Sequence, residues 1–490
     1  MRNGITRSGL QYAVRRSGSA VAYCALSIRC GTRDEAGFPC GIAHFTEHTL
    51  FRGTWRKSAG VISGYLDRLG GELNAYTTKE EIVLHATVLK EDLPKAARLL
   101  FELATEPSFP LREIETERGV VLDEIISYKD NPVEDAYDRF EGLLFAGHPL
   151  ENPILGTART VRKITPEDLF AFTGRFFVPE RMAFTVVADL DEKLLEKRVL
   201  RLVDSLFPAS SAEGIPSSAK YCVDAPEGVP SSAPAPAQQG NGRSEGNALS
   251  GAFSAEERVI PGDKAIAQGS GHSEGNALSG AFSAEERVFS GDKAIAQGSG
   301  HSEGKAVTFQ KTIDKHHHEV NAVIGGTAPS LYREKERIVT AVLANLLGGP
   351  ASNSLLNREL RERRGWVYGV ECNYTQYADT GIIAISFGCD RPNLERCLAA
   401  VDRILARLRE VPLSPRQMAA TRKQLLAQLA VSSDNGEAQC LSMGKSLLSW
   451  GRIASPEEIR AQVEAVTAED LLQAARTLFA PERLSRLLYL

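Results

Sequence analysis

The most informative segment of the sequence is Gly41-Ile-Ala-His-Phe-Thr-Glu-His-Thr-Leu50. On a helix, residues three and four apart share a face, so His44 and His48 point the same way one turn apart, with Glu47 beside them. This arrangement offers two imidazoles to one metal ion and a carboxylate to a water on that ion. The pattern is HxxEH, the reverse of the zinc-binding pattern HExxH. The alternative is a helix with two ordinary surface or core histidines.

A third metal ligand is expected on a neighbouring element, because catalytic zinc usually keeps three protein ligands and one open position. Residues 113–128, EIETERGVVLDEIISY, form a strong helical pattern in which Glu117 and Glu124 lie two turns apart on one face. Carboxylates on a partly apolar face are costly to bury unless a cation receives them. For these two glutamates in isolation, a solvated charged face is the favoured alternative.

The N-terminal segment contains several arginines and no acidic residue before Asp34. Such a composition can be that of a mitochondrial transit peptide. Residues 10–14 and 21–28, however, alternate or run apolar as strands do, and residues 15–19 between them have the character of a hairpin turn. We therefore predict two folded strands joined as a hairpin, in preference to a targeting peptide.

Two segments of the chain repeat each other. Residues 165–182, TPEDLFAFTGRFFVPERM, match residues 467–484, TAEDLLQAARTLFAPERL, at eight of eighteen positions. Thr165 and Thr467 each precede an acidic first turn and are predicted helix N-caps, and a strand-like run follows each helix. We expect an α+β fold with two similar α/β-layer domains, each a mixed or antiparallel sheet packed with helices.

The middle of the chain contains a tandem repeat. Residues 244–272 and 273–301 are near-identical copies of 29 residues, and the region before them is rich in Pro, Ser, Ala and Gln. A solenoid needs at least three units with apolar faces to stack. This region offers neither, so we predict a flexible insertion. The expected domains are residues 1–209 with the metal site, a linker at 210–305, and a second domain at 306–490.

Composition limits the class of protein. The chain has 490 residues, 43% hydrophobic and 24% charged, which is typical of a globular protein with two cores. A net charge of -5 gives no sign of a nucleic-acid binder. No apolar run approaches the roughly 20 residues of a membrane span, and no signal-peptide core is found. Eight cysteines without a CxxC pair indicate reduced thiols. We expect a cytoplasmic protein without nucleic-acid or membrane partners.

Four motifs together resemble the insulinase/pitrilysin family of metallopeptidases, most closely its short branch typified by the mitochondrial processing peptidase. They are GIAHFTEHTLFRGT at 41–54, LGGELNAYTTKEE at 69–81, ERGVVLDE at 117–124 and GHPLENPILGT at 147–157. In that family a Glu about 76 residues beyond the second His completes the zinc site, which here is Glu124. The resemblance implies one zinc ion per chain, held by His44, His48 and Glu124, with Glu47 as the base and Glu117 as a supporting acid.

The resemblance also implies residues that hold the substrate. The family uses an Asn-Ala pair on an edge strand to bind the substrate backbone, and Asn74-Ala75 is similar to that pair. The segment LRERRGWVY at 360–368 looks like the second-domain segment whose Arg and Tyr reach the scissile peptide. On this resemblance, Arg361 and Tyr368 inherit that role.

The expected activity is that of a zinc-dependent endopeptidase acting on extended or unfolded peptides, with Glu47 activating a zinc-bound water. The alternative is a non-catalytic scaffold or substrate-binding subunit of a complex like the processing peptidase. A purely structural zinc is disfavoured, because three N/O ligands leave an open site. In the short branch, four such domains enclose a chamber, so this chain is expected to supply half of a clamshell as a homodimer or a heterodimer with a related chain. Arg361 and Tyr368 would then act either at the zinc site of their own chain or at that of the partner chain.

Two features depart from the family pattern. Ala188-Asp189 stands where related chains usually have Gly in the strand after the first repeated helix, and the insertion at 210–305 is not a family feature. Neither departure touches the residues assigned to zinc. The second half has no HxxEH of its own, so the first half is expected to be the catalytic one.

Overall fold

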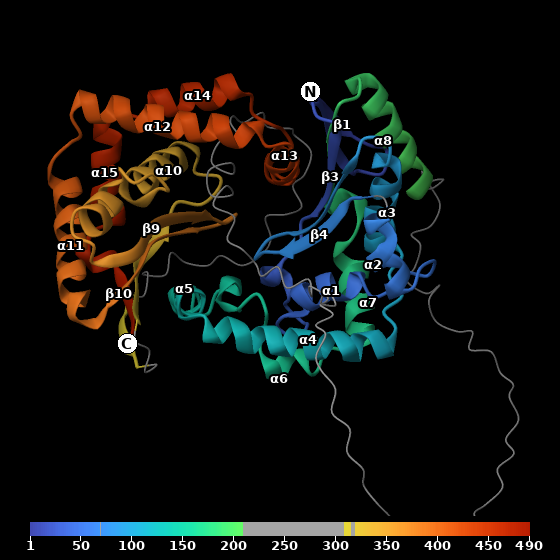
Figure 1. Cartoon of the computed structure of the whole chain (residues 1–490), viewed down its shortest axis with the longest axis horizontal. Coiled ribbons are helices and arrows are strands. Elements are labelled where there is room, and N and C mark those ends of the chain that lie inside the picture. Colours follow the sequence, from blue (N-terminus) through green and yellow to red (C-terminus); the bar gives the residue numbers. More distant parts are fainter. Residues whose placement is uncertain (69, 209–307, 315–318) are drawn as a thin grey trace, which may run out of the picture. The chain divides into compact units, whose positions relative to one another are not determined.

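The computed structural model describes residues 1–68, 70–208, 308–314 and 319–490 (Figure 1). The predicted linker at 210–305 and the run His316-His317-His318 lie outside the described residues. The boundaries proposed for the three segments of the chain therefore stay predictions.

The first sheet is mixed and has six strands. Its order is β1 (Arg2–Ile5), β2 (Gln11–Arg16), β6 (Met182–Ala188), β3 (Val21–Ile28), β5 (Ile82–Leu89) and β4 (Glu72–Thr77). Strands β2 and β6 run parallel, and the other neighbours run antiparallel. Strand β4 is therefore an edge strand of this sheet within the described part of the chain.

The predicted hairpin between residues 10–14 and 21–28 is wrong, although both strands exist. Strand β6 lies between β2 and β3, pairing parallel with β2 and antiparallel with β3. The N-terminal hairpin is instead formed by β1 and β2, in which Arg2 is opposite Val14. A tight turn fixes a hairpin locally, but the pairing with β6 joins segments far apart in the chain, which local patterns do not report.

The second sheet repeats the first. Its order is β7 (Gln310–Ile313), β11 (Ser485–Tyr489), β8 (Glu319–Ala328), β10 (Gly381–Asp390) and β9 (Val367–Gln376). Only β7 and β11 are parallel, as only β2 and β6 are in the first sheet. Strands β7, β11, β8, β10 and β9 thus correspond in order and direction to β2, β6, β3, β5 and β4. The predicted α+β fold with two similar layered halves is confirmed.

The helices repeat in the same way. Thr165 caps α7 (Pro166–Phe176) and Thr467 caps α15 (Ala468–Leu478), each through a capping box with an Asp at the third helical position. Two long helices, α4 (Leu111–Asp130) and α12 (Pro415–Asp434), also correspond. They are followed at once by α5 (Pro132–Leu144), capped by Asn131, and by α13 (Gly436–Trp450), capped by Asn435.

Each half supplies one helix to the sheet of the other. Helix α13 packs on β3 and β6 of the first sheet, opposite the face covered by α3 (Leu93–Thr105) and α8 (Glu192–Leu206) (Figure 1). Helix α5 packs on β8 and β11 of the second sheet. At the first of these contacts, Thr185 Oγ1 donates a hydrogen bond to the Cys440 carbonyl at 2.8 Å. At the second, the Tyr377 hydroxyl donates to Glu141. The two sheets are therefore joined by buried polar contacts as well as by apolar packing.

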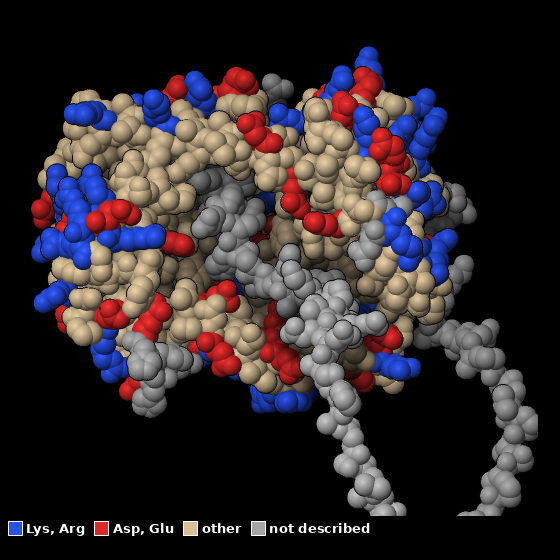
Figure 2. Space-filling model, in the orientation of Figure 1, with Lys and Arg blue, Asp and Glu red and all other residues tan. Residues whose placement is uncertain are grey.

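The remaining helices complete the layers. They are α1 (Ile42–Leu50), α2 (Ala59–Asp67), α6 (Ala158–Val161), α10 (Glu334–Gly348), α11 (Leu394–Glu410) and α14 (Pro456–Ala465). No helix among the described residues is both long enough and apolar enough to cross a lipid bilayer. On the face seen in Figure 2, acidic and basic side chains are interspersed over both halves, with basic residues gathered at the edge where α11 lies.

Candidate metal centre

Helix α1 begins where only glycine fits. Gly41 is the N-cap, with a left-handed φ of 92°, and a Cβ on it would lie 2.8 Å from the Gly156 Cα. A side chain at this position would be strained and would collide with backbone. The helix that follows presents His44 and His48 on one face, with ring centroids 4.5 Å apart. His44 is buried, with 6% of its surface exposed.

Helix α4 brings a carboxylate to both histidines. Glu124 Oε2 lies 3.3 Å from His48 Nε2 and 3.7 Å from His44 Nε2. Each of the three residues offers one ligand atom, and these atoms lie within 4.8 Å of one another. Within the described residues this is the one group of His, Cys, Asp or Glu side chains with the geometry to hold a metal ion. The structure thus brings together the three residues named from the sequence.

Glu117 lies two turns before Glu124 on α4 and holds the ring of His48 on the side away from Glu124. His48 Nδ1 donates to Glu117 Oε1 at 2.8 Å, and the other oxygen of Glu117 is ion-paired with Arg52. Glu117 is only 3% exposed. Because Nδ1 is engaged in this way, the other ring nitrogen of His48, Nε2, is directed at Glu124. Sequence reasoning named Glu117 but gave Arg52 no role.

Glu47 lies beside the metal-binding group and is positioned by the edge strand. Thr77, at the end of β4, donates from Oγ1 to Glu47 Oε2 at 3.2 Å. Burial raises the pKa of Glu47, opposed by His48 and by the Thr77 hydrogen bond, which lower it. A carboxyl with a raised pKa in contact with a metal site is suited to proton transfer near neutral pH. Thr77 belongs to a motif quoted above, yet nothing in the local pattern indicated this contact.

The electrostatics of the group suit a cation. Burial lowers the pKa of His44 to about 3, so its ring is neutral and has a lone pair to offer. Burial also lowers the pKa of His48, but its hydrogen bonds to Glu117 and Glu124 outweigh this and raise the pKa to about 10. The carboxylates thus favour positive charge at this position.

The donor set matches zinc. His44 Nδ1 is buried without a hydrogen-bond partner among the described residues. Two imidazole nitrogens and one carboxylate oxygen form a ligand set used by catalytic zinc, with a fourth position left open. The residues present therefore fit a zinc ion.

Asn74 and Ala75 lie on β4, an edge strand of the first sheet, as the resemblance implied. Their partners on β5 are His85 and Leu84. His85 is a strand residue whose Nδ1 pairs with Glu437 Oε1 of α13 at 3.0 Å, so it takes no part in the metal-binding group. Among the described residues, no strand pairs with the other side of β4.

Arg361 and Tyr368 lie on other elements than the residues of the metal-binding group. Arg361 is exposed in a short π-helical segment (Asn357–Glu362). Tyr368 is 61% exposed on β9, and its hydroxyl donates to Asp390 Oδ1 at 2.7 Å. Among the hydrogen bonds and ion pairs of the described residues, none joins either side chain to the group around His44.

The second half has an uncharged pair at the corresponding place. Gln428 is the fourteenth residue of α12, as Glu124 is of α4. Its Oε1 accepts a hydrogen bond from Asn345 Nδ2 of α10 at 2.5 Å. Two amides offer a metal no anionic ligand. The duplication therefore preserves the packing of the two helices without the metal-binding side chains.

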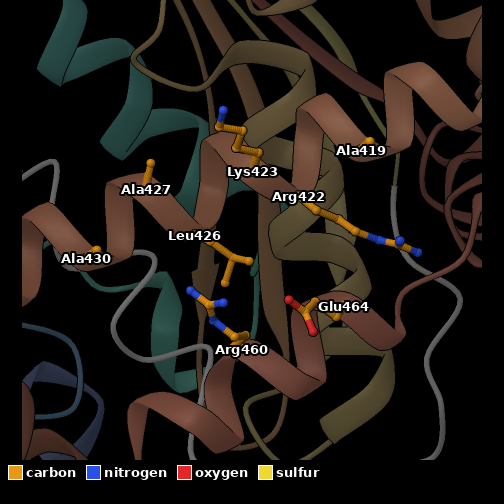
Figure 3. A pocket seen from close by; sticks show the side chains of 8 residues that line it. All are labelled: Ala419, Arg422, Lys423, Leu426, Ala427, Ala430, Arg460 and Glu464. Carbon is orange, nitrogen blue, oxygen red and sulfur yellow. The ribbon is translucent and has the colours of Figure 1, made fainter.

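The second half also contains a cavity of about 630 Å³ between α12 and α14 (Figure 3). Its lining combines Leu426 and small residues with Arg422, Lys423, Arg460 and Glu464. None of the residues in the metal-binding group lines it, so it is separate from that group.

The sequence and the fold are similar to those of known proteases. Residues 12–158 match the family described as Insulinase (Peptidase family M16), and residues 294–425 match the Peptidase M16 inactive domain. A zinc protease of Rickettsia bellii is 25% identical over 93% of this chain and 89% of its own length. A zinc protease of Bacillus subtilis is 23% identical over 93% of this chain and 90% of its own length. The solved structure of a protease from Helicobacter pylori has the same fold, with a TM-score of 0.73 at 16% identity over 100% of this chain and 99% of that one.

Proposed function

Because the chain belongs to the insulinase family, peptidase family M16, we propose that it is a zinc-dependent endopeptidase that hydrolyses peptide bonds in extended or unfolded peptides. The observation that carries the proposal is the convergence of His44, His48 and Glu124 beside a half-buried Glu47. Relatives described as zinc proteases support the choice of metal.

One zinc ion per chain would be held by His44, His48 and Glu124. When bound, zinc supplies Lewis acidity, which polarises a peptide carbonyl and makes water a better nucleophile at neutral pH. Glu117 fixes the ring of His48 through Nδ1, and Arg52 balances the charge of Glu117. These two residues support the site without touching the substrate.

Glu47 is the proposed general base. Its carboxylate takes a proton from the attacking water and later delivers it to the nitrogen of the leaving amine. The Thr77 hydroxyl holds one of its oxygens, which leaves the other to face the reacting water. The raised pKa of Glu47 makes the carboxyl a stronger base than an exposed glutamate and a competent acid in the second step.

The substrate is proposed to lie along β4 as an added strand. Main-chain groups of this edge strand near Asn74 and Ala75 would hydrogen-bond an extended peptide with little sequence selectivity. Because Thr77 lies on the same strand, two and three residues beyond this pair, the strand that binds the peptide also positions the base. Folded proteins would be poor substrates, since their backbone groups are already paired.

Arg361 and Tyr368 are proposed to act on substrate at the metal centre of a second chain. Two observations support this proposal. Both side chains are exposed, and among the described residues neither makes a hydrogen bond or ion pair with the group around His44. A homodimer or a heterodimer with a related chain would then enclose the clamshell chamber expected from the sequence. In that assembly the Tyr368 hydroxyl would leave Asp390 and donate to the developing oxyanion.

The proposal is tested by measuring zinc content and peptide cleavage for the wild type and for Glu47→Gln. We expect one zinc per chain in both proteins and turnover in the wild type alone, because Gln keeps the shape of Glu47 but cannot accept the proton. Turnover by Glu47→Gln would disprove the assigned base. A wild type that binds zinc and peptide but never cleaves, alone or with a related chain, would favour the scaffold subunit instead.

A further inference from the structure

The first turn of α1 has no cap of its own. The first N–H groups of any helix lack intrahelical partners, and Gly41 at the N-cap has no side chain to offer them. Glu35, six residues upstream, fills this role. Its Oε2 accepts from the Gly41 N–H at 2.9 Å and its Oε1 accepts from the Ala43 N–H at 3.0 Å.

The Glu35 side chain is buried, and specific partners offset the loss of its hydration. It is 3% exposed, and burial raises its pKa to about 7 against the two backbone hydrogen bonds and the positive charge of Lys79, which lower it. Lys79 is itself buried, and its Nζ pairs with Glu141 Oε2 at 3.4 Å. An acidic side chain is rarely buried to this extent without a specific partner, and here the partners are the N–H groups of one helical turn.

That turn carries His44, which has little else to orient it. His48 is held by its hydrogen bond to Glu117 at 2.8 Å. No hydrogen bond of the described residues involves the His44 ring, and its Nδ1 is buried without a partner. Apart from the packing that buries it and the Glu124 carboxylate 3.7 Å from its Nε2, the ring of His44 is placed by its backbone, which lies in the turn that Glu35 holds.

We propose that Glu35 is a positioning residue for the metal centre, which fixes the first turn of α1 from outside the helix and thereby places the ring of His44 for zinc. This inference rests on the proposed zinc site. A conventional N-cap side chain could not do the same, because the left-handed backbone and the contact with Gly156 restrict position 41 to glycine. Glu35 acts through backbone and touches neither zinc nor substrate.

Zinc affinity of the full chain, measured by competition with a chromophoric chelator, tests the proposal. Glu35→Ala leaves two buried N–H groups without an acceptor, and we expect zinc to bind roughly tenfold more weakly, as for the loss of a strong cap. Glu35→Gln keeps one acceptor oxygen and should fall between Glu35→Ala and the wild type. The absorption spectrum of the cobalt-loaded protein should change in the same order, because it reports ligand geometry at the metal.

Asp191→Ala is the matched control. Asp191 caps α8 in the same half, accepting from the N–H groups of Lys193 at 3.0 Å and Leu194 at 3.1 Å. Its loss should lower the thermal midpoint and leave zinc affinity and the cobalt spectrum unchanged. Wild-type affinity in both Glu35 variants would overturn the proposal, as would an equal loss in Asp191→Ala. If Glu35→Ala does not fold, Glu35→Gln decides alone. A wild type that binds no zinc would instead refute the proposed function.

Discussion

Thr77→Val tests how the base is held. The substitution keeps the shape of a side chain that is 6% exposed and removes only the hydroxyl that donates to Glu47 at 3.2 Å. A hydrogen bond to a charged group contributes about 1.5 kcal/mol at the lower end of its usual range. If that energy serves to orient Glu47 in the transition state, kcat/KM should fall roughly tenfold.

The pH dependence of Thr77→Val should change in a defined direction. Burial raises the pKa of Glu47, and the Thr77 hydrogen bond acts against this rise. Without the hydroxyl the pKa rises further, so a larger fraction of Glu47 is protonated at neutral pH. The acidic limb of the kcat/KM profile should therefore move to higher pH.

The assay is cleavage of an unstructured fluorogenic peptide across pH, with zinc content measured on the same samples. Thr77→Ser is the control, because it keeps the hydroxyl and should retain most of the activity. Zinc content should be unchanged in both variants. An unaltered acidic limb in Thr77→Val, or an equal loss in Thr77→Ser, would refute the role given to this hydrogen bond.

Three further results are expected. Glu117→Gln removes the charge that holds His48 and pairs with Arg52, so zinc affinity should fall roughly 10- to 100-fold, and an unchanged affinity in a chelator competition would contradict this. The pKa of Glu35 is raised from 4.5 to about 7, so the folded state binds this proton more tightly than the unfolded state does. The stability that this difference provides is fully present below about pH 4.5 and is lost as pH rises through about 7. The free energy of unfolding, measured by urea titration, should therefore depend less on pH in Glu35→Gln than in the wild type. Removal of zinc should abolish cleavage and lower the thermal midpoint, since free zinc at 100 times its Kd stabilises the fold by about 2.7 kcal/mol; equal midpoints with and without chelator would argue against a bound ion.

Local signals in the sequence predicted the elements well. The capping boxes at Thr165 and Thr467 lie within one turn of the chain and predicted two corresponding helices, which the structure contains. The helical pattern at 113–128 lies within the observed α4 (Leu111–Asp130). Helix periodicity and capping depend on neighbours in sequence, so a single chain is enough to recognise them.

Contacts between distant segments were not predictable in this way. The insertion of β6 between β2 and β3 and the exchange of α5 and α13 depend on pairing across the chain. The contacts of Thr77 with Glu47 and of Glu35 with the start of α1 have no periodic signal, because each joins a single side chain to one point on another segment. The three residues of the metal-binding group were found because HxxEH fixes two of them locally and the family resemblance supplied the third.

Two imidazoles of α1 and one carboxylate of α4 are proposed to share a single zinc ion. Diffraction from crystals of the zinc-loaded protein, recorded on both sides of the zinc absorption edge, tests it directly. We expect one anomalous peak per chain, at about 2.0 to 2.2 Å from a nitrogen of His44, a nitrogen of His48 and an oxygen of Glu124. A peak elsewhere, or a peak bound by the histidines with Glu124 turned away, would contradict this ligand assignment.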